Sequence, residues 1–273
     1  MTVIAHISDP HFGTVDAPVR EAILRDLHGE HVDLIVVSGD ITQRARSEQF
    51  REAKEFLEQL PTVPRLVIPG NHDIPLYDIF TRIFNPYRLF RRYIGTDLDP
   101  VYSDANVAVV CVNATKPTRH KNGVLTRWQI RKAGKRLTQF TQPFKIIATH
   151  QPLAVTLPHD ETNLARGATA ALDNWVPAGA DLFIGGHIHL PYIVPVKATT
   201  GERTAVVMQA GTAVSRRIRH GVPNSYNRIT LQTIDGRKHM RLERRDYDAA
   251  TETFAAKRVC NATSTEGSWT LSE

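Results

Sequence analysis

Short apolar runs rich in β-branched residues alternate with segments of helical period through the first half of the chain. This alternation is the feature that most limits the fold. The apolar runs cover residues 3–7, 34–37, 66–68, 145–148 and 182–184. Helical spacing of apolar residues is found in 18–28, 47–60 and 126–140. Strand-like runs that alternate with helices are typical of parallel βαβ units, so the sequence predicts an α/β fold.

The pattern changes after residue 189. The remaining runs, 192–196, 204–209, 226–234 and 239–244, are separated by Gly, Thr or Asp-Gly turn signals. Such spacing predicts antiparallel strands, and two packed sheets with helices outside would satisfy both halves. A length of 273 residues is enough for one large domain. We expect a single domain over 1–250, followed by a weakly ordered C-terminal tail over 251–273.

Each early apolar run ends on side chains that bind metals. These side chains are Asp9, His11, Asp40, Asn71, His150, His187 and His189. Groups just past the carboxyl ends of neighbouring strands share one crevice of an α/β sheet, so we expect a single site. Imidazole and carboxylate ligands suit Mn, Fe or Zn, and the lack of Cys disfavours a structural zinc site. The set is large enough for two divalent ions, which Asp40 is placed to bridge.

In order, the motifs resemble the five blocks of the calcineurin-like metallophosphoesterases. The blocks are Asp9-Pro10-His11, Gly39-Asp40, Gly70-Asn71-His72-Asp73, His150 and Gly186-His187-Ile188-His189. The Asn-His-Asp form and the Gly-His-x-His ending are similar to bacterial class III cyclic-nucleotide phosphodiesterases. The resemblance spans residues 3–189. It implies a four-layer α/β/β/α sandwich of two mixed sheets and the hydrolysis of a phosphodiester by a metal-activated water.

The resemblance also implies roles for single residues. One metal would be held by Asp9, His11, Asp40 and His189, and the second by Asp40, Asn71, His150 and His187. His72 would face the substrate phosphate and orient it or protonate the leaving oxygen, so we take His72 and Asp40 as catalytic. Asn71 and His72 are also expected to contact substrate. Asp73 would support His72 rather than bind metal.

Two departures from the family pattern bear on the substrate. Protein serine/threonine phosphatases carry an Arg after the second block and a Glu after the Asn-His pair, and both are absent here, which disfavours a protein substrate. Gln151 stands where many cyclic-nucleotide enzymes have a second His. A cyclic nucleotide or another small phosphodiester is the leading expectation. The alternative is a pyrophosphatase of a nucleotide-linked lipid precursor of the UDP-diacylglucosamine type, with an exonuclease third and a non-enzymatic scaffold last, since no ligand is missing.

Two segments each allow two interpretations. Residues 73–95 combine six aromatic residues with four Arg, and they form either a lid over the substrate or helices whose aromatics pack on the core. Residues 211–219 contain Arg216, Arg217 and Arg219, which are well shaped for phosphate. We expect Arg216 to contact an anionic group of the substrate, with a solvated basic loop as the alternative.

The formal net charge of +6 favours anionic partners. The basic clusters are too short to follow a nucleic-acid backbone, so no stable nucleic-acid complex is expected. The sequence begins without the pattern of a secretory signal, and no apolar segment approaches the length of a membrane span. A cytoplasmic location is therefore expected, with peripheral membrane contact if the substrate is a lipid. The sequence does not indicate an oligomeric state.

Overall fold

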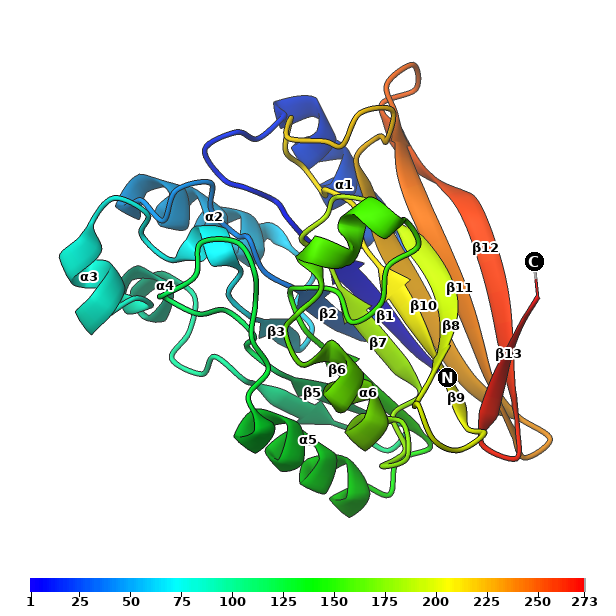
Figure 1. Ribbon diagram of the computed structural model, residues 1–273. Helices are drawn as coiled ribbons and strands as arrows, with labels where there is room; N and C mark the ends of the chain where they lie inside the picture. The colour runs from blue at the N-terminus through cyan, green and yellow to red at the C-terminus, as the bar shows by residue number, and fades with distance from the viewer. Residues whose placement is uncertain (273) are drawn as a thin grey trace.

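A computed structural model describes residues 1–272, which form two stacked β-sheets with helices on both outer faces (Figure 1). The first sheet has seven strands. In spatial order they are β13 (Ser268–Ser272), β12 (Thr253–Thr265), β11 (Arg237–Asp248), β10 (Ser225–Ile234), β1 (Thr2–Ile7), β2 (Leu34–Val37) and β3 (Arg65–Val67). The three strands β1, β2 and β3 are parallel, and the others pair antiparallel.

The second sheet has six strands. In spatial order they are β4 (Val101–Ser103), β5 (Val107–Cys111), β6 (Phe144–Ala148), β7 (Leu182–Gly185), β9 (Thr204–Gln209) and β8 (Tyr192–Lys197). Its centre, from β5 through β9, is parallel, whereas the edge strands β4 and β8 are antiparallel to their neighbours. The late strands predicted as one antiparallel set therefore divide between the two sheets, and β9 runs parallel to β7.

Helices cover the outer faces. The helices α1 (Ala17–Gly29) and α2 (Ser47–Gln59) pack on the first sheet, and α5 (Arg127–Gln139) and α6 (Ala168–Trp175) pack on the second (Figure 1). Strand β2 shows why four layers form. Its residues Leu34 and Val36 face the core between the sheets, while Ile35 and Val37 face the helices. A strand buried on both faces reads as a continuous apolar run, and the expected α/β/β/α sandwich is confirmed.

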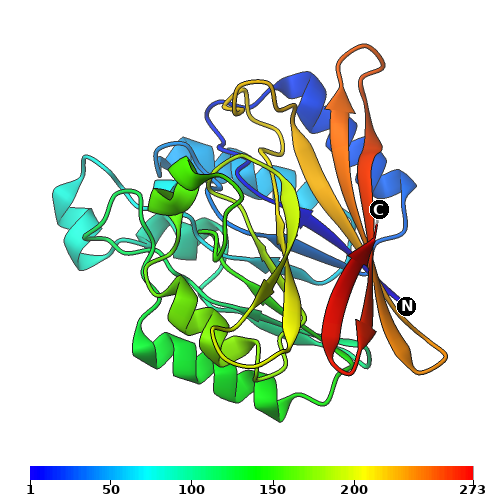
Figure 2. The same cartoon turned by 45° about the vertical axis from the view of Figure 1, so that its right-hand side comes forward.

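The C-terminal segment differs from the expectation of a weakly ordered tail. Residues 253–272 form β12 and β13, which extend the first sheet on the far side of β11 (Figure 2). Trp269 anchors this edge, because its ring is buried near Phe144 of the second sheet and its Nε1 donates to Asp181 Oδ1 at 2.9 Å. The expectation was wrong because the buried positions of β12 other than Phe254 carry small or polar side chains.

The aromatic segment 73–95 forms two short helices, of which one packs on the core and the other is exposed. In α4 (Arg88–Tyr93), Phe90 is fully buried and its ring lies edge-on to Phe50 of α2, 6.4 Å between centroids. In α3 (Ile79–Phe84), no residue is buried. The packing interpretation therefore describes α4 and fails for α3. No helix within residues 1–272 combines the length and the apolar character needed to cross a bilayer.

Candidate metal centre

Loops that follow five strands bring the predicted ligands together at one edge of the two sheets. They form two groups, Asp9 with His11 and His189, and Asp40 with His150 and His187. Within each group the ligand atoms lie within 4.8 Å of one another. The five loops follow β1, β2, β3, β6 and β7, all parallel strands, so their carboxyl ends meet as expected.

Asp40 lies between the two groups. Its Oδ1 is 3.3 Å from His150 Nε2 in one group, and its Oδ2 is 3.8 Å from His11 Nε2 in the other. Asn71 joins the second group, since its Oδ1 lies 3.2 Å from the same His150 nitrogen. This placement is the one that a bridging carboxylate needs.

The backbone at these positions is strained. Nine non-glycine residues of the described chain have positive φ, and five of them are Asp9, His11, Asp40, His187 and His189, with φ between 44° and 75°. A non-glycine residue in this region costs about 1 to 3 kcal/mol and persists only where its surroundings fix it. The concentration of strain in one loop cluster indicates that these side chains are held for chemistry rather than for packing.

Two glycines allow the loops to approach one another. A Cβ on Gly70 would lie 2.2 Å from Asp40 Oδ1, and one on Gly186 would lie 2.2 Å from Asp9 Oδ2. Those distances are far below van der Waals contact, so any larger residue would displace the carboxylates. The Gly-Asn-His and Gly-His motifs are therefore needed for steric reasons as well as chemical ones.

Several buried polar atoms of the cluster have no hydrogen-bond partner. They are Asp9 Oδ1, His11 Nδ1, and both ring nitrogens of His187. Buried polar groups are normally satisfied, and unpaired ones mark a missing ion, water or ligand. His11 Nε2 and His189 Nε2 also point at each other, 3.0 Å apart. Convergent, unpaired N and O donors fit two divalent cations.

The electrostatics of the cluster favour metal-binding protonation states at His11, His187 and Asp40, whereas His150 would have to lose a proton to bind an ion. Burial lowers the pKa of both His11 and His187 to about 3, so both imidazoles are neutral at physiological pH. Burial opposes ionisation of Asp40, but the neighbouring charges of His150 and His72 hold its pKa below the usual range. Burial alone would lower the pKa of His150. The charge of Asp40 and its hydrogen bond to the ring together outweigh burial and raise that pKa to about 9. An ion in this group would compete with the His150 proton.

Outer hydrogen bonds orient the ligands. His150 Nδ1 donates to the carbonyl of Ser38 at 2.8 Å, which directs Nε2 toward Asp40 and Asn71 as the nitrogen that would bind an ion. Asp9 Oδ2 accepts from Ser8 Oγ at 2.7 Å, and Ser8 in turn accepts from Ser38 Oγ at 2.9 Å. His6 Nε2 lies 2.9 Å from the same Ser38 hydroxyl. His6 therefore has a hydrogen-bonded ring, and it extends the network behind Asp9.

Asp73 supports the centre through the backbone. Its carboxylate accepts from the amides of Gly70, Ile41 and Thr42 at 2.8 to 3.0 Å and from the Thr42 hydroxyl. These bonds tie the loop of Asp40 to the turn of Asn71 and His72. Asp73 belongs to neither ligand group. It acts on the loop backbone and makes no contact with the His72 ring, which instead donates from Nδ1 to the Gln43 carbonyl at 2.9 Å.

A cavity of about 430 Å³ opens onto the cluster. Asp40, Asn71, His72, His187 and His189 line its floor, and its rim is formed by Gln43, Arg44, His120, Lys121 and Arg217. Asp40 is the only carboxylate among the lining residues. The cavity is therefore suited to an anionic ligand.

The basic loop meets the cavity through a different arginine from the one predicted. Arg217 Nη1 lies 3.0 Å from His72 Nε2 and 3.1 Å from Gln43 Oε1. Arg216 lies outside the lining, 73% exposed and 4.0 Å from Asp16. Arg219 is committed to Asp160 at 2.9 Å. Arg217 thus takes the place expected for Arg216. Arg216 is directed toward Asp16 and Arg219 toward Asp160, which leaves Arg217 as the side chain that faces the cavity.

Sequence reasoning missed Arg44, His120 and Lys121. All three stand on loops that follow the carboxyl ends of β2 and β5, the edge where the ligands were correctly placed. Their position after a strand end was the available signal. Gln151, the departure in the fourth block, lies near this loop, with its Nε2 3.4 Å from the Lys121 carbonyl.

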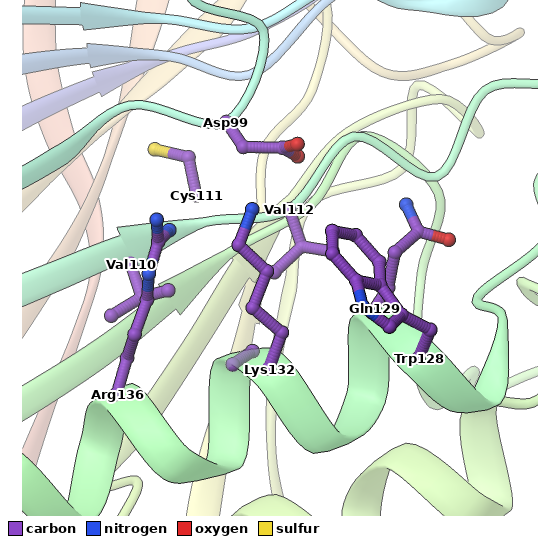
Figure 3. Close-up of a pocket in the computed structure, with 9 residues that line it drawn as sticks. Asp99, Val110, Cys111, Val112, Trp128, Gln129, Lys132 and Arg136 are labelled. Carbon is purple, nitrogen blue, oxygen red and sulfur yellow. The ribbon is translucent and has the colours of Figure 1, made fainter.

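A second hollow lies against α5, away from the cluster (Figure 3). Trp128, Lys132 and Arg136 of α5 face Cys111 and Asp99 across it (Figure 3). Its volume of about 10 Å³ is roughly that of one water-sized sphere, so it is too small for a substrate.

The profile of the calcineurin-like phosphoesterase family matches residues 2–191 of this chain. The chain belongs to the calcineurin-like phosphoesterases. The two His and Asp groups that could hold metal ions are intact in it. The resemblance inferred from the five motifs is therefore confirmed.

Curated relatives are distant. A glycerophosphodiester phosphodiesterase of Enterobacter lignolyticus is 40% identical over 82 residues, covering 26% of this chain and 29% of that protein. A probable cyclic nucleotide phosphodiesterase of Synechococcus is 26% identical over 163 residues, covering 56% of this chain and 59% of that protein. The matched region thus spans less than two thirds of either relative.

Solved structures share the fold. PhoD superposes with a TM-score of 0.74 at 9% identity, covering 100% of this chain and 71% of that one. A purple acid phosphatase from yellow lupin seeds gives a TM-score of 0.69 at 14% identity, covering 96% of this chain and 53% of that one. At such identities the likeness establishes the architecture alone.

Proposed function

We propose that this protein hydrolyses a phosphodiester, either a cyclic nucleotide or another small diester, in a reaction that depends on two divalent metal ions. The observation that carries the proposal is the pair of buried ligand groups that share Asp40 at the floor of an electropositive cavity. The relatives from Enterobacter lignolyticus and Synechococcus are named for phosphodiesterase activity, which supports the same reaction class.

The residues present fit two ions. Asp9, His11, Asp40 and His189 would hold the first, and Asp40, Asn71, His150 and His187 would hold the second. Mn, Fe and Zn all suit this set of N and O donors. When bound, such ions neutralise charge on phosphoryl oxygens and acidify a water.

His72 would contact the substrate phosphate. Its Nδ1 donates to the Gln43 carbonyl, so Nε2 faces the cavity, where Arg217 now donates to it. A phosphate oxygen that binds Arg217 would release His72 Nε2 from this bond. His72 can then orient the phosphate or, when protonated, donate a proton to the leaving oxygen.

The rim cations would orient the rest of the substrate. Arg44, Lys121 and Arg217 come from three different loops and surround the cavity mouth. Arg offers a planar fork that matches phosphate geometry, and Lys a point charge. None of the aromatic residues of 73–95 lines this cavity, so its lining gives no support to a lipid-precursor substrate.

The decisive experiment loads the purified protein with Mn, Fe or Zn, counts ions per chain, and assays a panel of phosphoesters. Bis(p-nitrophenyl) phosphate should be hydrolysed faster than p-nitrophenyl phosphate. Cyclic nucleotides, glycerophosphodiesters and UDP-linked lipids would then identify the natural class. A protein that binds two ions and hydrolyses no diester would refute the proposal and indicate a scaffold.

A further inference from the structure

Helix α3 presents its apolar side chains to solvent. Ile79, Phe80, Ile83 and Phe84, together with the preceding Tyr77, are 63% to 78% exposed. The four helical positions lie on adjacent turns, and the rings of Phe80 and Phe84 are 4.7 Å apart, so they form one continuous patch. Both views show α3 standing off the body at the outer left (Figures 1 and 2). Contiguous exposed patches of this kind mark interaction sites.

The polarity of α3 is inverted relative to an ordinary surface helix. Its cation, Arg82, turns toward the protein, where Nη1 donates to the Pro75 carbonyl at 2.8 Å and Nη2 to the Arg119 carbonyl at 2.9 Å. A helix that folded only to cover the core would place its Phe and Ile side chains inward and Arg82 outward. In α3 the Phe and Ile side chains instead face outward, where an external apolar surface can contact them.

A basic pocket of about 260 Å³ adjoins the patch. Arg44, Arg46 and Arg88 line it, and Asp78 is its only carboxylate. The Oδ1 of Asp78 caps α3 by accepting from the Thr81 amide at 2.9 Å, and three Arg still outnumber this one carboxylate in the pocket. Within residues 1–272, the ion pair recorded for Arg46 is a distant one with exposed Glu48, at 4.0 Å. The pocket is smaller than most drug-sized sites, about 300 to 1,000 Å³, and suits a phosphate headgroup.

We propose that α3 and this pocket dock the protein on an anionic lipid bilayer. The side chains of Ile79, Phe80, Ile83 and Phe84 enter the boundary between headgroups and acyl chains, as the apolar face of an interfacial helix does. A lipid phosphate binds between Arg46 and Arg88. Apolar insertion and electrostatic attraction together give stable attachment where neither is sufficient alone.

Charge argues against a second copy of this chain as the occupant. Residues 74–95 contain Arg82, Arg88, Arg91 and Arg92 against the single acid Asp78, a net charge of +3. Two copies meeting patch to patch would oppose these like charges, which costs free energy, whereas anionic lipid neutralises them.

The docking surface is continuous with the rim of the metal cavity. Arg44 lines both the basic pocket and the cavity. Arg82 binds the carbonyl of Arg119, which is followed in the chain by His120 and Lys121 of the rim. Attachment through α3 would therefore hold the cavity mouth close to the lipid headgroups. The docking itself does not depend on which phosphodiester is hydrolysed.

The test is sedimentation of the full-length protein with phosphatidylcholine vesicles that do or do not contain phosphatidylglycerol. We expect binding only to the anionic vesicles, and weaker binding at raised salt. The double variant Ile83→Ser with Phe84→Ser should lower the partition coefficient by more than about tenfold, because the inserted apolar area is lost. Arg46→Ala and Arg88→Ala should each lower it about fivefold.

Matched controls lie on α5. Trp128 is 62% exposed and Arg131 is also exposed, so Trp128→Ser and Arg131→Ala remove the same kinds of group elsewhere and should leave vesicle binding unchanged. All variants should keep wild-type thermal unfolding, since the altered side chains are exposed.

The proposal would be overturned if the wild-type protein bound vesicles equally with and without phosphatidylglycerol. It would also be overturned if the control variants lost as much binding as the α3 variant. A dimer by light scattering that the α3 variant converts to monomer would assign the patch to self-association instead. Failure of diester hydrolysis would count against the proposed function alone, because vesicle binding is measured separately.

Discussion

The floor and the rim of the cavity are built in opposite ways. At and beneath the floor, Asp9, Asp40 and His150 are buried and held by hydrogen bonds, and two of the three, Asp9 and Asp40, stand on strained backbone. On the rim, Lys121 and Arg217 are exposed side chains on loops, with few contacts. In this chain, the strand ends therefore fix the candidate metal ligands, while exposed loop side chains form the rest of the cavity.

The largest effect is expected on the floor. If Asp40 bridges two ions, Asp40→Asn removes a ligand charge from both groups at once, so metal content and diester hydrolysis should both fall, activity by orders of magnitude. Metal analysis and turnover of bis(p-nitrophenyl) phosphate measure the two effects. Near-normal turnover with two ions per chain would show that Asp40 is not a bridge.

His72 tests the boundary between floor and rim. As a phosphate contact or proton donor outside both ligand groups, it should tolerate His72→Ala with metal content unchanged, while kcat falls roughly 10²- to 10⁴-fold. The loss should be smaller when the leaving group is nitrophenolate, which needs no proton. Loss of an ion in this variant would instead move His72 into the metal centre.

Ser8 tests whether the outer hydrogen bonds of the floor matter. Ser8→Ala removes the hydroxyl that donates to Asp9 Oδ2, while the amide of His187 still donates to the same oxygen at 2.9 Å. Loss of one such orienting bond typically costs about 10- to 100-fold in metal affinity. Metal competition titration measures this. Unchanged affinity would mean that the His187 amide alone orients Asp9.

The ligands could be predicted from the sequence because strand geometry constrains them. A residue just past the carboxyl end of a parallel strand has one edge to occupy, so five apolar runs were enough to gather Asp9, Asp40 and His150 at one place. The four layers followed from the same runs, since a strand buried on both faces must be covered on both. The predicted bounds of α1, α2 and α5 agree with the structure to within about one residue.

The C-terminal strands and the rim could not be predicted in this way. In β12 the buried positions include Cys260, Ala262 and Ser264, whose small or polar side chains carry little period-two signal. Their burial comes from pairing with β11, which is a tertiary effect. On the rim, the orientation of the Arg216 and Arg217 side chains depends on contacts with Asp16 and Gln43, which are remote in sequence.

The smallest effect separates two adjacent arginines on the rim. Arg217 lies against His72 and lines the cavity, so Arg217→Ala should remove one charge-assisted contact to an anionic substrate. Solvent screening limits the loss to on the order of tenfold in kcat/KM, mostly through KM. Arg216→Ala is the matched control, because the Arg216 guanidinium faces Asp16 outside the cavity and its loss should leave both constants unchanged. The contrast should widen for a diester that carries a second phosphate and narrow for bis(p-nitrophenyl) phosphate, which carries one charge. Equal kinetics for the two variants on both substrates would mean that the loop of residues 211–219 is solvated surface without a role in binding. Specificity would then have to come from Arg44, His120 and Lys121.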